Sequence, residues 1–431
     1  MRQLAISMSA CALFCTFCCL PAYSGFQQDA ALYNKQGVEY LQAKKFHEAI
    51  AVFEKAYRLV PDNNTVKHNL SYAYAGLAAE YALANNWKQA TSYASQAYQL
   101  NTSDAVLKTN LALYYSYYAM VLFEQSNFPK AKENFEQALR YDDNNWQAHL
   151  GLGKLKYNEG SFPEAASHWK KAFAIKPDLP EIKDRLAMLE KEIALGGKFR
   201  QLELSYFDIQ YEGGKKEDLA RKAIQILHKA YNDVGYAFDY YPQDKTTVII
   251  YTGKQFQETT GEPKWAAGGY DGVVRAVASD FASEAILTTT LYHEYTHAVL
   301  YKKFGGNFPY WLDEGLAQLL EPGGKTLSPE DVAYLKKGLA KAKFMSIGRL
   351  DRALRDEKDE SVIQLAYVEA RTLLQYMDER YHMYRIRSLL EELKQGAAID
   401  TAIKKVFFVD IPHLEKDWLD WFAKKYGPVA P

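Results

Sequence analysis

The chain has 431 residues, with 52 lysines and arginines, 53 aspartates and glutamates, and four cysteines. Its formal net charge of −1 gives no electrostatic attraction to nucleic acid or to an anionic membrane surface, so neither is expected as a partner. Hydrophobic residues make up 48% and charged residues 24%, as in ordinary globular proteins, and the length indicates two or three domains.

Residues 1–24 are typical of a secretory signal peptide. A positive start at Arg2 is followed by an apolar segment, and Ala22 and Ser24 are the small residues expected before cleavage after Ser24. All four cysteines lie in this segment, so the mature chain would have no disulfide, no cysteine-ligated metal and no cysteine nucleophile. We expect an exported protein, periplasmic or secreted, with no membrane span after leader cleavage; a retained N-terminal anchor is the alternative.

The next part of the chain contains an internal repeat. Residues 30–63 carry small and aromatic residues at set places, and the same frame returns at 146–179, with looser versions at 71–104 and 112–145. This frame resembles the tetratricopeptide repeat, a helical hairpin in which small residues let two helices approach and a proline ends the second helix. The wider spacing before repeats 2 and 3 predicts that their first helices are longer.

Residues 180–195 predict a terminal capping helix, because each repeat buries a face on the next and the last one needs cover. We therefore expect an N-terminal all-α solenoid over residues 30–195. Its concave surface would bind a peptide or protein partner; alternatively, the array is a packing platform for the second half. The tyrosine-rich run 114–118 could line such a groove, although tyrosines on a long helix more commonly pack between repeats.

The second half begins after Gly196-Gly197, which break the helical pattern. Strands are predicted where apolar residues alternate or form a short buried run, and helices where they recur with helical spacing. Strands followed by helices favour an α+β domain. The predicted strands are 202–212, 246–252 and 270–278, a helix is predicted over 215–234, and helices dominate from residue 283 onward.

The strongest chemical signal is the sequence His-Glu-Tyr-Thr-His at 293–297, in a predicted helix. Residues four apart share a helix face, so His293 and His297 can bind one metal ion from the same side while Glu294 reaches a water on it. A catalytic zinc usually has three protein ligands and one open position. Glu314, on the next predicted helix, can be the third ligand, and Asp313 beside it could orient a ligand or simply cap the helix.

The segment HEYTHAVLYKKFGGNFPYWLDEGLAQLLE, residues 293–321, resembles the peptidase MA-like domain of the gluzincin clan, which is often fused to tetratricopeptide repeats in exported bacterial proteins. The resemblance implies an α+β gluzincin-type metallopeptidase domain over residues 200–428. Zn²⁺ would be held by His293, His297 and Glu314, with Glu294 as the general base. Aminopeptidase specificity is not implied, because the spacing to Glu314 is shorter than in that branch and a G-x-M-E-N segment is absent.

The same resemblance suggests further site residues. Tyr367, in the segment AYVEA, matches a tyrosine of similar domains that stabilises the tetrahedral oxyanion; packing within a helix is the alternative. The strand over 270–277 could pair with an extended peptide substrate beside the zinc. Asp271 and Arg275 on that strand could contact substrate, although a structural or solvent-facing role is favoured.

These observations favour an exported zinc metallopeptidase that hydrolyses peptide bonds and uses its repeats to bind substrate or a partner protein. Two alternatives stay open at this point. One is a repeat-based interaction scaffold whose hydrolase domain is inactive or regulatory. The other is a zinc hydrolase acting on a non-peptide amide.

Overall fold

The computed structural model describes residues 16–197, 199–212, 217–261, 268–278, 284–306, 308–342 and 345–427. The chain forms two compact units. Unit 1 comprises Met1–Phe123 and Phe128–Leu152, and unit 2 comprises Glu124–Asn127 and Gly153–Pro431. The division falls inside helix α7 (Trp146–Asn158), which belongs to the last predicted repeat.

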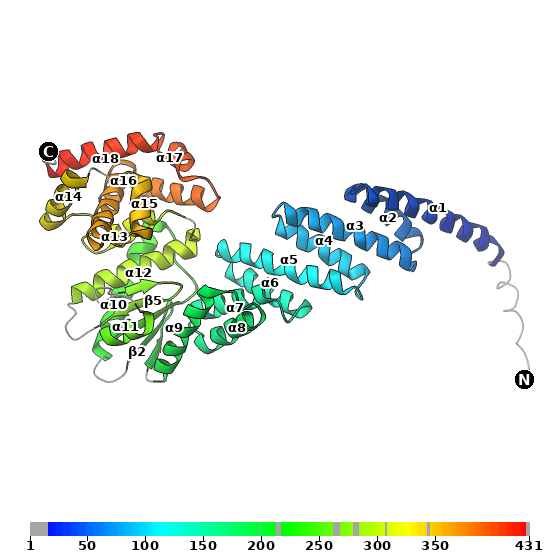
Figure 1. Cartoon of the computed structure of the whole chain (residues 1–431), viewed down its shortest axis with the longest axis horizontal. Coiled ribbons are helices and arrows are strands. Elements are labelled where there is room, and N and C mark those ends of the chain that lie inside the picture. Colours follow the sequence, from blue (N-terminus) through cyan, green and yellow to red (C-terminus); the bar gives the residue numbers. More distant parts are fainter. Residues whose placement is uncertain are drawn as a thin grey trace, which may run out of the picture. The chain divides into compact units, whose positions relative to one another are not determined.

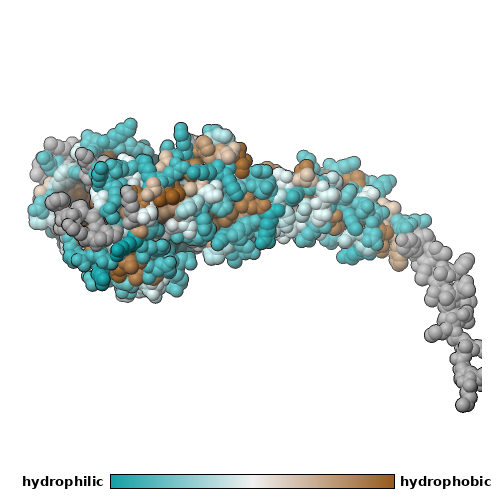
Figure 2. All heavy atoms as spheres, turned by 90° about the horizontal axis from the view of Figure 1, so that it is seen from below, coloured by the Kyte–Doolittle hydropathy of each residue, from teal (hydrophilic) through white to brown (hydrophobic). Residues whose placement is uncertain are grey.

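The predicted leader lies partly outside the described residues, since the first 15 are not among them. Helix α1 begins at Thr16 and continues past Ser24 to Gln42. In the described part of the chain, no helix is long and apolar enough to cross a membrane. On the face shown in Figure 2, hydrophobic residues gather in separate patches between hydrophilic ones.

Unit 1 is a series of helical hairpins (Figure 1). Its helices are α1, α2 (Phe46–Leu59), α3 (Asn64–Leu83), α4 (Trp87–Leu100), α5 (Ala105–Glu124), α6 (Phe128–Tyr141) and the start of α7. The second helices α2, α4 and α6 each have 14 residues, whereas the first helices α3 and α5 have 20 and α7 has 13. The first helices of repeats 2 and 3 are thus longer than that of repeat 4, as predicted, whereas α1, which contains the first helix of repeat 1, has 27 residues because it begins at Thr16.

Small residues allow the helices of a hairpin to approach closely. Gly37 of α1 lies against the ring of Phe53 in α2, and a Cβ added at Gly37 would come within 2.5 Å of that ring. Phe53, Ala49 and Ala56 of α2 are fully buried. The glycine and alanine positions of the repeat frame are thus required by packing between neighbouring helices.

The many tyrosines of unit 1 pack between helices. Tyr117 of α5 stacks on Trp87 of α4, with ring centroids 4.4 Å apart and planes 17° apart. Tyr115 of α5 stacks in the same way on Tyr141 of α6, with centroids 5.8 Å apart. These contacts agree with the interpretation of the 114–118 run as packing between helices.

Unit 2 contains one five-stranded sheet and the helices around it. The strands are β1 (Phe199–Glu203), β2 (Phe207–Glu212), β3 (Thr246–Tyr251), β4 (Gly268–Tyr270) and β5 (Val274–Val277). The helices are α8 (Phe162–Ile175), α9 (Pro180–Gly196), α10 (Glu217–Phe238), α11 (Gly253–Thr260), α12 (Glu284–Phe304), α13 (Tyr310–Leu320), α14 (Pro329–Ala342), α15 (Ile347–Asp356), α16 (Glu360–Lys394), α17 (Ile399–Phe407) and α18 (Ile411–Tyr426).

The sheet has the strand order β1-β2-β3-β5-β4. The central pairs β2–β3 and β3–β5 are parallel, whereas the outer pairs β1–β2 and β4–β5 are antiparallel. The prediction of one continuous strand over 202–212, and of another over 270–278, is therefore wrong. Both contain a reversal, and in the second a glycine with a φ of +114°, Gly272, lies between β4 and β5.

The two faces of the sheet are covered by different helices. Val274 and Ala276 of β5 lie in the same hydrophobic core as residues of α10 and α12. Side chains alternate along a strand, so Arg275 points to the opposite face, where it contacts Glu192 of α9. The predicted capping helix over 180–195 is confirmed as a helix, and it lies against the sheet.

We predict that replacing Tyr117 with leucine lowers the free energy of unfolding by about 1 kcal/mol more than replacing Tyr72 with leucine does. Tyr117 stacks on Trp87, whereas Tyr72 lies on α3 of the same unit with a side chain that is 49% exposed. Urea denaturation of the two variants, followed by circular dichroism, measures the difference. Equal losses in the two variants would contradict a packing role for the tyrosine stacks.

Candidate metal centre

Two histidines of α12 converge on one point. Helix α12 runs from Glu284 to Phe304, and eight of its 21 residues belong to the hydrophobic core of unit 2. His293 and His297 lie one turn apart with ring centroids separated by 4.8 Å. Their side chains are 19% and 11% exposed, so both rings face a partly enclosed space rather than open solvent.

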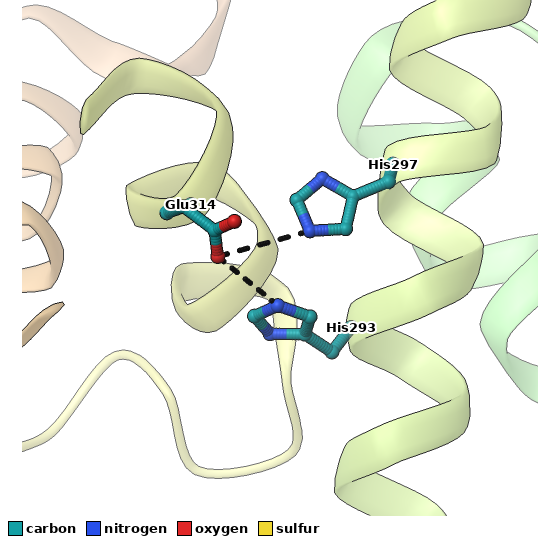
Figure 3. A group of neighbouring side chains, drawn as sticks. All are labelled: His293, His297 and Glu314. Carbon is teal, nitrogen blue, oxygen red and sulfur yellow. Dashed lines mark ion pairs between the residues drawn. The ribbon is translucent and has the colours of Figure 1, made fainter. Parts of the chain in front are cut away.

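Helix α13 brings the third residue of the cluster to the histidines. Glu314 Oε2 lies 3.3 Å from His293 Nε2 and 3.8 Å from His297 Nε2. Figure 3 marks these two ion pairs with dashed lines. Two ligands on a tetrahedral zinc, each about 2.1 Å from the ion, are roughly 3.4 Å apart. The potential ligand atoms of His293, His297 and Glu314 all lie within 4.8 Å of one another, so the set has the size of a zinc site.

The charged oxygen of Glu314 also fits a metal ligand. Glu314 Oε2 is buried, and no hydrogen bond to it is made by the residues that the structure describes. An unpartnered buried carboxylate oxygen is costly unless a cation or donor meets it. The His₂Glu donor set is one that zinc accepts. The residues present therefore fit the ion that the sequence predicted.

Each histidine is oriented by a second carboxylate. His297 Nδ1 lies 2.7 Å from Asp313 Oδ1, and His293 Nδ1 lies 2.8 Å from Glu321 Oε1. When Nδ1 donates its hydrogen to a carboxylate, Nε2 is left with a free lone pair, which is the form that binds a metal. Both Nε2 atoms point at Glu314. Asp313 was one of the sequence candidates for such a role.

Glu321 was not predicted from the sequence. It follows α13 directly and lies seven residues after Glu314, a spacing that places two residues on the same helix face. That periodicity was a usable signal. It was inconclusive without a structure, because nothing in the sequence shows which way the last turn of α13 faces.

The electrostatics of the cluster keep Glu314 charged. Burial would raise the pKa of Glu314, but the contact with His293 and the charge of His297 outweigh it, so the pKa is lowered. Burial disfavours the charged form of His293, yet its contacts with Glu314 and Glu321 hold the pKa well above the usual range. Burial raises the pKa of Glu294, with the two histidines opposing it.

Glu294 lies between α12 and the edge of the sheet. Its side chain is 8% exposed, and it follows His293 directly on α12. At Gly268 of β4, an added Cβ would lie 3.0 Å from Glu294 Oε1 and 2.5 Å from Thr290 Cγ2. The edge strand β4 therefore packs directly on the helix face that carries Glu294.

The remaining predicted residues are Asp271, Arg275 and Tyr367. Arg275 is buried and forms ion pairs with Glu192 and Asp271, so the structural role that was favoured for it agrees with the structure. Tyr367 lies half-buried on α16, four residues before Arg371. The guanidinium of Arg371 pairs with Asp331 of α14. A place for Tyr367 beside the histidines stays a prediction.

Comparison with known families identifies the repeat region and the domain that carries the His₂Glu cluster. Residues 222–424 match the Peptidase MA superfamily, and residues 30–63 and 119–180 match tetratricopeptide repeats. The chain contains tetratricopeptide repeats and a Peptidase MA superfamily domain. This superfamily domain contains the whole His₂Glu cluster.

Individual relatives are more distant. The chain is similar to the mouse protein O-mannosyl-transferase TMTC1, with 31% identity over 70 residues, which are 16% of this chain and 7% of that protein. Among solved structures, MamA AMB-1 is 18% identical, with 38% of this chain and 82% of that chain covered and a TM-score of 0.24. YrrB, described as a TPR protein with an unusual peptide-binding site, is 18% identical, with coverages of 40% and 82% and a TM-score of 0.25. Neither TM-score supports a further comparison.

We predict that Glu321→Gln lowers the affinity of the protein for Zn²⁺ by about 10- to 100-fold, because the amide no longer holds His293 as a charged carboxylate does. Competition with a chromophoric chelator measures the affinity. Glu330→Gln is the matched control, since Glu330 is an exposed carboxylate in the first turn of α14. An affinity equal to that of the control would show that Glu321 does not orient a ligand.

Proposed function

We propose that the protein is a zinc-dependent metallopeptidase that is exported and hydrolyses peptide bonds. The observation that carries this proposal is the convergence of His293, His297 and Glu314 within ligand distance of one another. Glu294 lies directly beside them on the same helix. The match to the Peptidase MA superfamily supports a metallopeptidase in coarser terms.

Zinc held by these three residues would polarise the substrate carbonyl and lower the pKa of a water to about 7. Glu294 would accept the proton of that water and pass it to the leaving amine. Its burial between α12 and β4 keeps the carboxylate out of bulk solvent, where competing proton exchange would occur. Asp313 and Glu321 hold the two imidazoles so that both Nε2 atoms face Glu314 and would face an ion bound there.

The substrate would bind along β4. This strand is the last of the sheet, and it is antiparallel to β5 on its inner side. A peptide in extended form can add to such an edge through main-chain hydrogen bonds. Since Gly268 packs against Glu294, a peptide paired with β4 would pass beside the catalytic carboxylate.

The repeats would bind the substrate protein or another partner. The tetratricopeptide matches support protein interaction in general, and the described helices of unit 1 would supply the surface. The alternative is a scaffold whose hydrolase domain is inactive. The complete His₂Glu cluster with Glu294 beside it favours an enzyme over that alternative.

We predict that Glu294→Gln lowers kcat on a peptide substrate by about 10²- to 10⁴-fold, because the amide cannot accept the proton. Zinc content should stay at one ion per chain, since Glu294 is not a ligand. Cleavage of an unbiased peptide library by mass spectrometry, with metal analysis of the same samples, measures both effects. Full zinc content with no cleavage by the unaltered protein would leave the scaffold or a non-peptide amide as the function.

We predict that Tyr367→Phe lowers kcat by about 10²-fold while leaving KM and zinc affinity near their original values, because an oxyanion donor acts only in the transition state. Steady-state kinetics on the best library peptide test it. Tyr334→Phe is the control, since Tyr334 lies on α14 and donates to the Ser361 carbonyl. A kcat for Tyr367→Phe equal to that of the control would assign Tyr367 to packing.

A further inference from the structure

A buried charge network lies on the face of the sheet opposite α12. At its centre is Arg275 of β5, whose side chain is 3% exposed. Its Nε and Nη2 donate to Glu192 Oε1 at 3.0 and 2.9 Å, and its Nη1 donates to Asp271 Oδ1 at 2.5 Å. The Tyr157 hydroxyl accepts from Arg275 Nη2 and donates to Asp271 Oδ2, the latter at 2.7 Å.

The partners of Arg275 come from two parts of the sequence. Asp271 lies in the turn between β4 and β5. Tyr157 belongs to α7 and Glu192 to α9, the first helix of the last repeat and the helix that follows that repeat. The last repeat, through Tyr157, and the helix after it, through Glu192, thus supply two of the groups that satisfy a buried guanidinium of the hydrolase sheet, where an unpaired charge would be costly.

The end of α7 also fits the turn of the β4–β5 hairpin. Gly272 has a φ of +114°, and an added Cβ would lie 2.1 Å from Asn158 Oδ1. Thr247 Oγ1 of β3 donates to the Asn158 carbonyl at 3.3 Å. The turn is therefore in direct contact with the helix, and little room is left between them.

The hairpin connects this network with the metal centre. Strand β4 has three residues, and it pairs with β5 through Gly268↔Ala276, Gly269↔Arg275 and Tyr270↔Val274. Gly268, the first residue of β4, packs on Glu294, and Asp271 directly follows Tyr270, the last residue of β4. A strand this short has few hydrogen bonds of its own, so the contacts at its turn contribute much of what holds it in place.

We propose that Tyr157 and Glu192 are positioning residues of the hydrolase site, which hold the β4–β5 hairpin and thereby set the edge strand against which a peptide substrate pairs. This proposal rests on the proposed function for the role of the strand, but the placement of the strand can be measured without any substrate. It makes the last repeat a part of the hydrolase site rather than a spacer.

Hydrogen–deuterium exchange of the full chain tests the proposal. Tyr157→Phe removes the hydroxyl that joins Arg275 and Asp271, and the segment Gly268–Val277 should then exchange about tenfold faster. Tyr231→Phe is the matched control. Tyr231 is also a buried tyrosine of unit 2, but it lies on α10 and donates to the Pro242 carbonyl at 3.4 Å.

A general loss of stability would affect the two variants alike, so faster exchange in Tyr157→Phe alone supports positioning. Unchanged exchange in Tyr157→Phe, or equal acceleration in both variants, would overturn it. If Tyr157→Phe does not fold, Glu192→Gln keeps the shape of the side chain and should accelerate exchange in the same segment; unchanged exchange there would also overturn the proposal.

Kinetics separate this proposal from the proposed function. With a cleavable peptide, Tyr157→Phe should raise KM about fivefold and change kcat less than about twofold, with zinc content unchanged. If the unaltered protein cleaves no peptide, the proposed function fails, while the exchange comparison still decides whether the last repeat positions the hairpin. A fall in kcat with KM unchanged would contradict a role in placing the substrate strand.

Discussion

Helix α12 lies in the core of unit 2, and yet it must carry two histidines and a glutamate. Polar groups in such surroundings need partners, since their burial is otherwise costly. The partners come from α13, which directs Asp313, Glu314 and the following Glu321 at the two imidazoles. Each imidazole is thereby held by one carboxylate at Nδ1 and faces Glu314 with Nε2. This pairing makes the cluster suited to a metal ion.

The same requirement operates on the other side of the sheet. Arg275 is buried on a strand next to the edge, and its charge is satisfied by Asp271 of its own hairpin and by Glu192 of α9. Since α9 follows the last repeat, the repeat array and the hydrolase share a packed boundary within unit 2. The compact units divide at Leu152 and Gly153, which lies within the last repeat rather than after it. The end of α7, in that repeat, therefore contributes to the fold that supports β4.

Several parts of the structure could be predicted from residues alone. The repeat frame with Gly37, Phe53 and Ala56 depends on local helix packing, so it predicted helical hairpins and the longer α3 and α5. The placement of two histidines four residues apart on one helix face follows from the pitch of a helix alone. The hairpin turns were missed, because an alternating segment with an internal reversal has the same pattern as one long strand. Leader cleavage and export stay predictions.

By itself, the sequence determined the residue types and spacing of the site: His293, Glu294 and His297 share a helix, and Glu314 follows on the next one. Local periodicity is sufficient for that, because one turn of a helix places such residues side by side. Only the tertiary structure decided that Glu321 orients His293, that β4 packs on Glu294, and that Tyr157 and Glu192 reach Arg275. These contacts join residues that are 26 to 118 positions apart, and no sequence period relates them.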